Sequence, residues 1–219
     1  LGLSQEFLRR NHQVIMNGRN AELLEEKVKQ MLDQGYQAIG VAGDVSHEDT
    51  FQMLIYAAQN KFGKIDIWIN NAGIPQSNKY FDELSSKEIQ NLVNINITSL
   101  MLGTKAAIQF FKKQGHGQVF NMEGFGSDGR MMDKLSLYGS SKRTVQYFSK
   151  SVSKEVKEES IKVGILSPGM VRTDFLSHSM IDADERERLR NQKVFDILAE
   201  EVEVVTKFLG NKILQSHQK

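Results

Sequence analysis

Short apolar runs alternate with longer helical stretches along the 219 residues of the chain. The runs have the length of buried strands and cover residues 12–16, 38–42, 65–69, 118–122 and 161–166. The stretches beside them predict helices, over residues 3–10, 21–34, 48–62, 86–113 and 134–159. Two charged stretches, over 184–198 and 201–214, predict further helices at the end of the chain.

Strands that alternate with helices predict right-handed crossovers and a parallel sheet that is covered on both faces. In such sheets, ligands bind beyond the carboxyl ends of the strands. The segments that follow the five predicted strands are all polar or glycine-rich, namely 18–19, 44, 70–73, 123–127 and 167–173. We therefore expect a ligand site at this edge of the sheet, whatever family the chain belongs to.

The composition excludes several classes of protein. With 40% hydrophobic and 25% charged residues, the chain is not grossly disordered, and its net charge of +1 gives no strong field for nucleic acid. Cysteine is absent, which excludes disulfides and cysteine-ligated metal and makes a reducing, cytoplasmic compartment the expected one. No apolar run reaches the roughly 18 residues of a membrane helix. The five histidines lack ligand spacing, so we expect no metal site.

Tyr138 and Lys142 stand four residues apart at the start of a predicted helix and therefore share one helical face. A cation near a phenol favours the phenolate and lowers the pKa of the phenol. A tyrosine in that setting can act as a general acid or base nearer neutral pH. An isolated pair of this kind is more often an exposed aromatic residue beside a solvated lysine, so the surrounding motifs decide between the two interpretations.

Those motifs resemble the short-chain dehydrogenase/reductase family over essentially the whole chain. Each is weak alone, but their order and spacing are specific: Asp44-Val45, Asn70-Asn71-Ala72-Gly73, Asn96, Tyr138 with Lys142, and Pro168-Gly169 followed by Thr173. The resemblance implies an α/β fold with a Rossmann-type doubly wound parallel sheet in three layers. It also implies one NAD(P)-binding domain over 1–219, a small-molecule carbonyl or alcohol substrate, and a homodimer or homotetramer built on the long helices.

The roles of the family members carry over by position. Tyr138 would donate a proton to a substrate carbonyl, or accept one from an alcohol. Lys142 would hold the nicotinamide ribose and lower the pKa of Tyr138, while Asn96 would kink its helix and hold a water in the proton relay. The segment over about 174–198 would be the substrate lid. The other matches would bind the cofactor: Asp44 and Val45 at the adenine, Asn71, Ala72 and Gly73 at the adenine ribose, and Pro168, Gly169, Met170, Val171 and Thr173 at the nicotinamide.

The catalytic serine of the family has no counterpart at its usual place. Alignment on the fourth predicted strand puts Gly124 in the serine position, with Glu123 before it. Ser127, three residues later, would reach the site if the loop folds back, and it is the candidate substitute ahead of Glu123. Loss of one polarising donor typically costs a few kcal/mol of transition-state stabilisation, which need not abolish activity.

The first strand of the family and its glycine-rich phosphate loop also have no counterpart here. The family pattern places the last glycine of that loop just before Leu1, so roughly 15–20 residues of the pattern are missing. Cofactor preference can be read after the first predicted strand, where Arg19 stands without an acidic neighbour. An acidic residue would select NAD, whereas arginine pairs with a 2′-phosphate, so we expect NADP(H) rather than NAD(H).

Three functions stay open. The runs 117–127, 138–142 and 167–174 look like the chlorophyll b reductase branch of the family, in which an acid-glycine pair also replaces the serine. The first function is NADP(H)-dependent hydride transfer between the nicotinamide and a carbonyl or alcohol. The second is chlorophyll(ide) b reductase-like reduction of a formyl group. The third is dinucleotide binding by a catalytically impaired or scaffold protein, against which the preserved Tyr138 and Lys142 argue.

Overall fold

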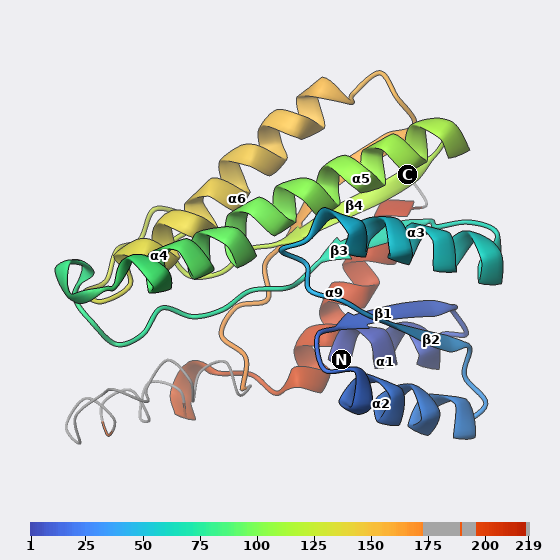
Figure 1. Cartoon of the computed structure of the whole chain (residues 1–219), viewed down its shortest axis with the longest axis horizontal. Helices are drawn as coiled ribbons and strands as arrows, with labels where there is room; N and C mark the ends of the chain where they lie inside the picture. Colours follow the sequence, from blue (N-terminus) through green and yellow to red (C-terminus); the bar gives the residue numbers. More distant parts are fainter. Residues whose placement is uncertain (173–188, 190–195, 218–219) are drawn as a thin grey trace.

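A computed structural model of the chain describes residues 1–172, 189 and 196–217 (Figure 1). Helices and strands alternate in chain order, as the sequence predicts. The elements are α1 (Gly2–Arg9), β1 (Val14–Gly18), α2 (Ala21–Asp33), β2 (Ala38–Ala42), α3 (Glu48–Phe62), β3 (Ile67–Asn70), η1 (Phe81–Glu83), α4 (Ser86–Val93), η2 (Asn94–Thr98), α5 (Ser99–Gln114), β4 (Gly117–Met122), α6 (Ser136–Glu155), β5 (Ile161–Leu166) and α9 (Val202–His217).

Every strand pair in the described part of the chain is parallel, which confirms the predicted α/β class. Strand β1 pairs with β2, and β4 lies between β3 and β5. Two strands begin two residues later than the apolar runs predict. His12 still donates its N–H to Phe7 in the turn after α1, and both backbone groups of Ile65 bond to the Gln114 side chain instead of to a strand.

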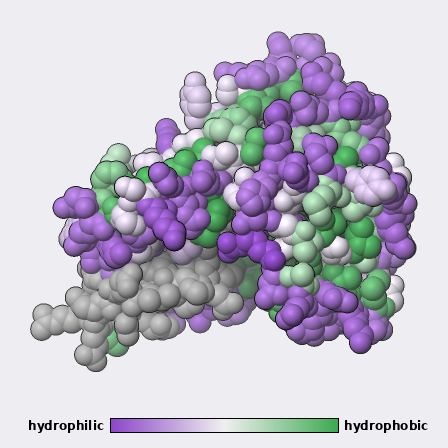
Figure 2. Space-filling view, viewed as in Figure 1, coloured by the Kyte–Doolittle hydropathy of each residue, from purple (hydrophilic) through white to green (hydrophobic). Residues whose placement is uncertain are grey.

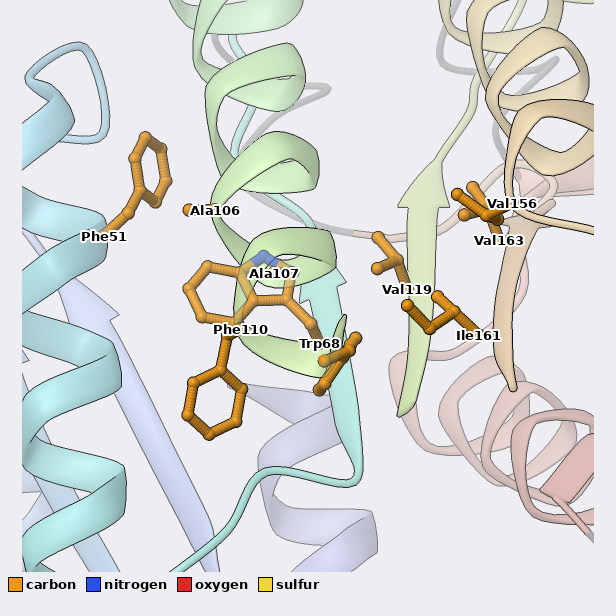
Figure 3. Packing of buried hydrophobic residues seen from close by; sticks show 10 residues of the cluster. Phe51, Trp68, Ala106, Ala107, Phe110, Val119, Val156, Ile161 and Val163 are labelled. Atoms are coloured by element: carbon orange, nitrogen blue, oxygen red, sulfur yellow. The ribbon is translucent and has the colours of Figure 1, made fainter. Parts of the chain in front are cut away.

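The helices cover both faces of the strands and so form the expected three layers. Helices α3, α5 and α6 pack on one face, and α1, α2 and α9 on the other. Successive residues of β4 show the alternation, because Val119 packs with Trp68 and Phe111 whereas Phe120 packs with Phe7 and Leu209. Figure 3 shows the first of these two clusters, where side chains from α3, α5, β3, β4 and β5 converge.

The described strands form two sheets, β1–β2 and β3–β4–β5, instead of one continuous sheet. A cavity of about 2580 Å³ is lined by residues 14–18 of β1 and residues 67–70 of β3, and it separates the facing edges of the two sheets. The described sheet is thus broken between β1 and β3. Figure 2 shows hydrophobic side chains gathered on the viewed face between α3 and α2, beside this break.

The long helix expected over 86–113 is interrupted. Ser85 caps α4 together with Glu88 in a capping box, so the helix begins at Ser86 as the sequence predicts. The π-helical segment η2 then separates α4 from α5, and Gly115, at φ 92°, ends α5 in the left-handed conformation. Helix α6 is shorter than the predicted 134–159, because Lys134 has φ 60°, which a helix does not accept.

The predicted lid over about 174–198 lies largely outside the described residues, and so does the predicted helix over 184–198. Thr173 also falls outside them. Helix α9 corresponds to the predicted helix over 201–214 and packs on α1. Its buried residues Val205, Leu209 and Ile213 recur every four positions, as expected for one apolar face of a helix.

Candidate active site

Most of the sequence-predicted site residues line one cavity at the carboxyl ends of the strands. This is the same cavity of about 2580 Å³ that extends between β1 and β3. The segments that follow β1, β3, β4 and β5 all contribute to its wall, which agrees with the edge that the sequence predicts. The predicted residues that line it are Arg19, Val45, Asn71, Ala72, Gly73, Ser127, Tyr138, Lys142, Pro168, Gly169, Met170 and Val171.

Asp44 and Asn96 support the cavity from behind its wall. The carboxylate of Asp44 accepts the backbone N–H of Ser46 at 2.9 Å, and this bond is the main cause that lowers the pKa of Asp44. Asn96 is buried in η2, where its Nδ2 donates to the Ile74 carbonyl at 3.0 Å and its Oδ1 accepts the Ile74 N–H at 2.8 Å. Asn96 also donates to the Ser141 hydroxyl at 3.2 Å, so it ties the segment after β3 to α6.

Tyr138 is held by the start of α6, and a glutamine far away in the sequence fixes that start. The side-chain oxygen of Gln76 accepts the N–H groups of Leu137 and Tyr138, at 2.9 and 3.1 Å. Gln76 is only 2% exposed, and its Nε2 donates to the Lys79 carbonyl. Two of the four N–H groups that a helix start leaves unpaired are thereby satisfied. Sequence reasoning missed this contact, because no short-range motif joins residues that are 62 positions apart.

Lys142 lies one helical turn below Tyr138 and is 5% exposed. Its ammonium is 5.6 Å from the centre of the Tyr138 ring and donates to the Met122 carbonyl at 3.3 Å. Burial lowers the pKa of Lys142 to about 8, and the charge of Glu123 partly opposes that effect. A β-carbon on Gly73 would lie 3.5 Å from the Lys142 ammonium, so the glycine of the segment after β3 faces the lysine.

The expected lowering of the tyrosine pKa is wrong for this structure. Burial raises the pKa of Tyr138 to about 12, because the phenolate would lose its hydration. The ammonium of Lys142 lies near the face of the ring and bonds to Met122. Tyr138 is therefore protonated at neutral pH, which is the state that a proton donor needs.

The loop after β4 folds back, as the prediction for Ser127 requires. The N–H of Ser127 donates to the Gly124 carbonyl at 3.2 Å, and the Ser127 carbonyl accepts from Arg143 at 2.8 Å. Ser127 is buried and lines the cavity. Gly124 lies directly against Tyr138, since a β-carbon there would come within 2.5 Å of the phenol oxygen. The backbone of Gly124 and the hydroxyl of Tyr138 are therefore neighbours in the wall of the cavity.

The mouth of the cavity carries large apolar side chains on the surface. Tyr80, Phe125 and Met132 line the cavity and stay 52%, 36% and 57% exposed. The ammonium of Lys134 lies 5.4 Å from the centre of the Tyr80 ring. These residues stand in irregular segments, where hydrophobic periodicity carries no signal, and sequence reasoning did not find them.

Comparison with known proteins places the chain in a family. The family model described as short chain dehydrogenase matches residues 1–183. The chain belongs to the short-chain dehydrogenase family. It is 35% identical over 217 residues to the chloroplastic chlorophyll(ide) b reductase NOL of Arabidopsis thaliana, covering 94% of this chain and 60% of that protein. It is 27% identical over 188 residues to a diacetyl reductase of Staphylococcus epidermidis, covering 84% and 72%.

The first of these relatives confirms the resemblance to the chlorophyll b reductase branch, although the chain spans only about 60% of its length. Solved structures of the same fold include a gluconate 5-dehydrogenase from Burkholderia cenocepacia in complex with NADP and tartrate. That chain has a TM-score of 0.81 and 20% identity, with 95% of this chain and 82% of that one covered. A 3-ketoacyl-(acyl-carrier-protein) reductase from Brucella melitensis complexed with NADH has a TM-score of 0.81 and 25% identity, with 94% and 82% covered.

Two further searches concern the part of the chain that the structure describes. None of its helices is long and apolar enough to cross a bilayer. Within the same residues, no three histidine, aspartate or glutamate side chains are grouped as metal ligands would be.

Proposed function

We propose that the protein is a carbonyl reductase that uses NADP(H), with Tyr138 as the proton donor and Lys142 beside it. The observation that carries the proposal is the placement of both groups on one face of α6, buried at the wall of a single cavity. Asn96 holds the segment after β3 against α6, and the buried Ser127 lines the same cavity as Tyr138. Burial of an ammonium costs free energy. A scaffold protein without catalytic activity would have no need to bury Lys142 here.

The protonation state of Tyr138 favours reduction over oxidation. A phenol whose pKa is about 12 carries its proton at neutral pH and can donate it to an oxygen that gains negative charge. The charged Lys142 stabilises the phenolate that is left behind. Reduction therefore starts from the protonation state that the site already has.

The residues at the cavity fit the ribose and nicotinamide portions of a dinucleotide. Lys142 and Gly73 approach each other there, and the glycine leaves room that a β-carbon would narrow. When bound, the cofactor supplies the hydride. Asn71, Ala72, Pro168, Gly169 and the neighbouring Met170 and Val171 form the adjoining wall. The described residues include no glycine-rich loop between two strands, so this part of the chain assigns no group to the pyrophosphate.

Arg19 supports NADP(H) as the cofactor rather than NAD(H). It lines the cavity directly after β1, next to Asn20, which caps α2. Its charge is one of the minor causes that lower the pKa of Asp44, and its planar guanidinium is suited to a 2′-phosphate. The predicted roles of Asp44 and Val45 at the adenine and of Thr173 at the nicotinamide remain proposals of the same kind.

A bulky apolar carbonyl compound is the substrate class that the cavity mouth favours. Tyr80, Phe125 and Met132 present exposed apolar surface where a substrate would enter, and such surface marks binding sites. The similarity to a chlorophyll(ide) b reductase makes a formyl group on a large ring the second candidate. A lid over about 174–198, a homodimer or homotetramer built on α5 and α6, and a reducing compartment stay predictions.

The experiment measures oxidation of NADPH by the full chain with a panel of carbonyl compounds. The panel contains diacetyl, an aromatic ketone and a formyl-bearing tetrapyrrole, each with NADPH and with NADH. Turnover that is faster with NADPH and with the bulky compounds is the expected result. Absence of turnover with every compound, although NADPH binds, would contradict the proposed function and favour the scaffold.

A further inference from the structure

We propose that Glu123 is a positioning residue that keeps the buried ammonium of Lys142 protonated while the reaction proceeds. This inference deepens the proposed function, on which its kinetic consequence rests. Glu123 immediately follows β4, and its backbone N–H donates to the Leu166 carbonyl at 3.0 Å. The preceding residue, Met122, supplies the carbonyl that Lys142 bonds at 3.3 Å, so Glu123 directly follows the residue that holds the ammonium.

The carboxylate of Glu123 is unusual in its surroundings. One of its oxygens, Oε2, is sealed from solvent and has no hydrogen-bond partner, which no other buried side-chain atom shows in the described part of the chain. A buried acceptor without a partner normally costs free energy and calls for an explanation. Attraction to a nearby buried cation supplies one, because a charge pair acts over several ångströms without a hydrogen bond.

Lys142 needs such a counter-charge more than a surface lysine does. It is 5% exposed, and its hydrogen bond to Met122 is made to an uncharged carbonyl. The aliphatic part of Lys142 also packs closely against Gly124. A β-carbon on Gly124 would lie 3.4 Å from two carbons of the lysine side chain. Without compensation, burial favours the neutral amine.

Few other ionisable groups face Lys142. On α6 the neighbour is Tyr138, whose phenol is protonated at neutral pH. Gly73, in the segment after β3, lies against the ammonium, and the Asn96 amide of η2 lies against the same glycine; neither group is ionisable. Of the side chains whose charge acts on the pKa of Lys142, Glu123 is the acid that raises it. In the proposal, Glu123 is the counter-charge that keeps Lys142 protonated at neutral pH.

The structure also separates this role from that of the family serine. The position next to Glu123 holds Gly124, where a β-carbon would lie 2.5 Å from the Tyr138 hydroxyl. Glu123 itself acts through Lys142, and Ser127 is the candidate for the polarising hydroxyl. In the acid-glycine pair, Glu123 keeps Lys142 charged, and Gly124 leaves space for the hydroxyl of Tyr138.

The test measures the pKa of Lys142 directly in the full chain. Lysine labelled with ¹³C at Cε is incorporated, the Lys142 signal is assigned by its loss in Lys142→Met, and its shift is followed against pH. Glu123→Gln and Glu123→Met are expected to lower the pKa of Lys142 by roughly one unit, as loss of a counter-charge within several ångströms implies. Glu123→Asp keeps the charge and is expected to retain most of the wild-type value.

Asp128→Asn is the matched control, since Asp128 is a carboxylate of the same loop that pairs with Arg130 instead. It is expected to leave the pKa of Lys142 unchanged. A Glu123→Gln titration that coincides with that of wild type would overturn the inference. If the pKa moves as expected but no carbonyl compound is reduced by wild type, the positioning role stands and the proposed function fails.

Discussion

The hydroxyl of Tyr138 lies so close to the backbone of Gly124 that a β-carbon on residue 124 would be 2.5 Å from the phenol oxygen. That distance is far below van der Waals contact, so any side chain at position 124 forces the tyrosine ring to move. Gly124 therefore lets the hydroxyl of Tyr138 approach the backbone more closely than any residue with a β-carbon would. The contact also places the reactive oxygen against the end of β4.

Replacement of Gly124 by alanine tests this contact. Because a displacement of about 1 Å at a reacting group can cost roughly 100-fold in rate, we expect kcat/KM of Gly124→Ala to fall by about that factor. The cost in unfolding free energy should be smaller, about 1 kcal/mol, since a single ring can tilt. Both quantities are measured, by steady-state kinetics and by urea unfolding.

The control is the same substitution in a Tyr138→Phe background. Removal of the hydroxyl removes the atom that the new methyl group meets, so Gly124→Ala should cost less stability there than in wild type. Equal costs in the two backgrounds would show that the contact with Tyr138 is not what position 124 requires.

Burial of Lys142 predicts a rise in stability with pH. Its pKa falls from 10.5 in the unfolded chain to about 8 in the folded one, so between these values the unfolded state binds more protons. Stability therefore rises as pH increases through that window, by up to about 3 kcal/mol, and the charged lysine costs most below pH 8. Lys142→Met should abolish the rise and be more stable than wild type at pH 7.

Urea unfolding of wild type and Lys142→Met at pH 7.0, 8.5 and 9.5 measures this effect. The range stops there because the raised pKa of Tyr138 makes stability fall again above about pH 10. If the unfolding free energy of wild type does not change with pH over this range, or changes as that of Lys142→Met does, the claim that a buried Lys142 titrates there is contradicted.

Replacement of Gln76 should affect catalysis, although Gln76 is not one of the reacting groups. Gln76→Leu removes the acceptor for the N–H groups of Leu137 and Tyr138, and loss of a helix cap typically costs about 1–2 kcal/mol. We expect that loss in unfolding free energy, together with a lower kcat as the start of α6 loosens. Gln76→Glu should restore both, because a carboxylate is favourable at a helix start. Failure of this rescue would mean that the bond from the Gln76 amide to the Lys79 carbonyl, which glutamate cannot make, matters more than the acceptor.

Arg19 predicts the choice of cofactor. Arg19→Ala removes the guanidinium that is proposed for the 2′-phosphate, so the dissociation constant of NADPH should rise by roughly 10- to 100-fold, as for loss of a charge-assisted bond. The dissociation constant of NADH should change little. Calorimetry on both cofactors measures the ratio, and an equal loss for both would remove Arg19 from the selection.

The alternation of strands and helices was enough to predict the layers of the fold and the edge that carries the site. Where the predicted bounds of a helix differ from those in the structure, the cause is local. Lys134 stops α6 from starting early because its φ is positive. The π-helical segment η2 interrupts the long helix at Asn94–Thr98, where the resemblance implied a kink at Asn96. The separation into two sheets is a tertiary property that hydrophobic periodicity does not contain.

The site was predictable where short motifs carry the chemistry, as at Tyr138, Lys142 and Gly73. It was not predictable where contacts join distant segments. Gln76 bonds to the start of α6 from 62 residues away in the sequence. The pKa of Tyr138 is raised by burial, and the spacing of Tyr138 and Lys142 says nothing about burial. Glu123 could be seen in the sequence as a departure from the family, but its relation to Lys142 required the structure.

The central claim is that Tyr138 donates the proton during carbonyl reduction. The most direct measurement is a single-turnover experiment, in which wild type and Tyr138→Phe, each saturated with NADPH as checked by calorimetry, react with the best carbonyl compound of the panel. We expect the variant to bind NADPH as wild type does and to reduce the compound at least about 100-fold more slowly, within the usual range for loss of a general acid. Reduction by Tyr138→Phe at a rate close to that of wild type would contradict the account.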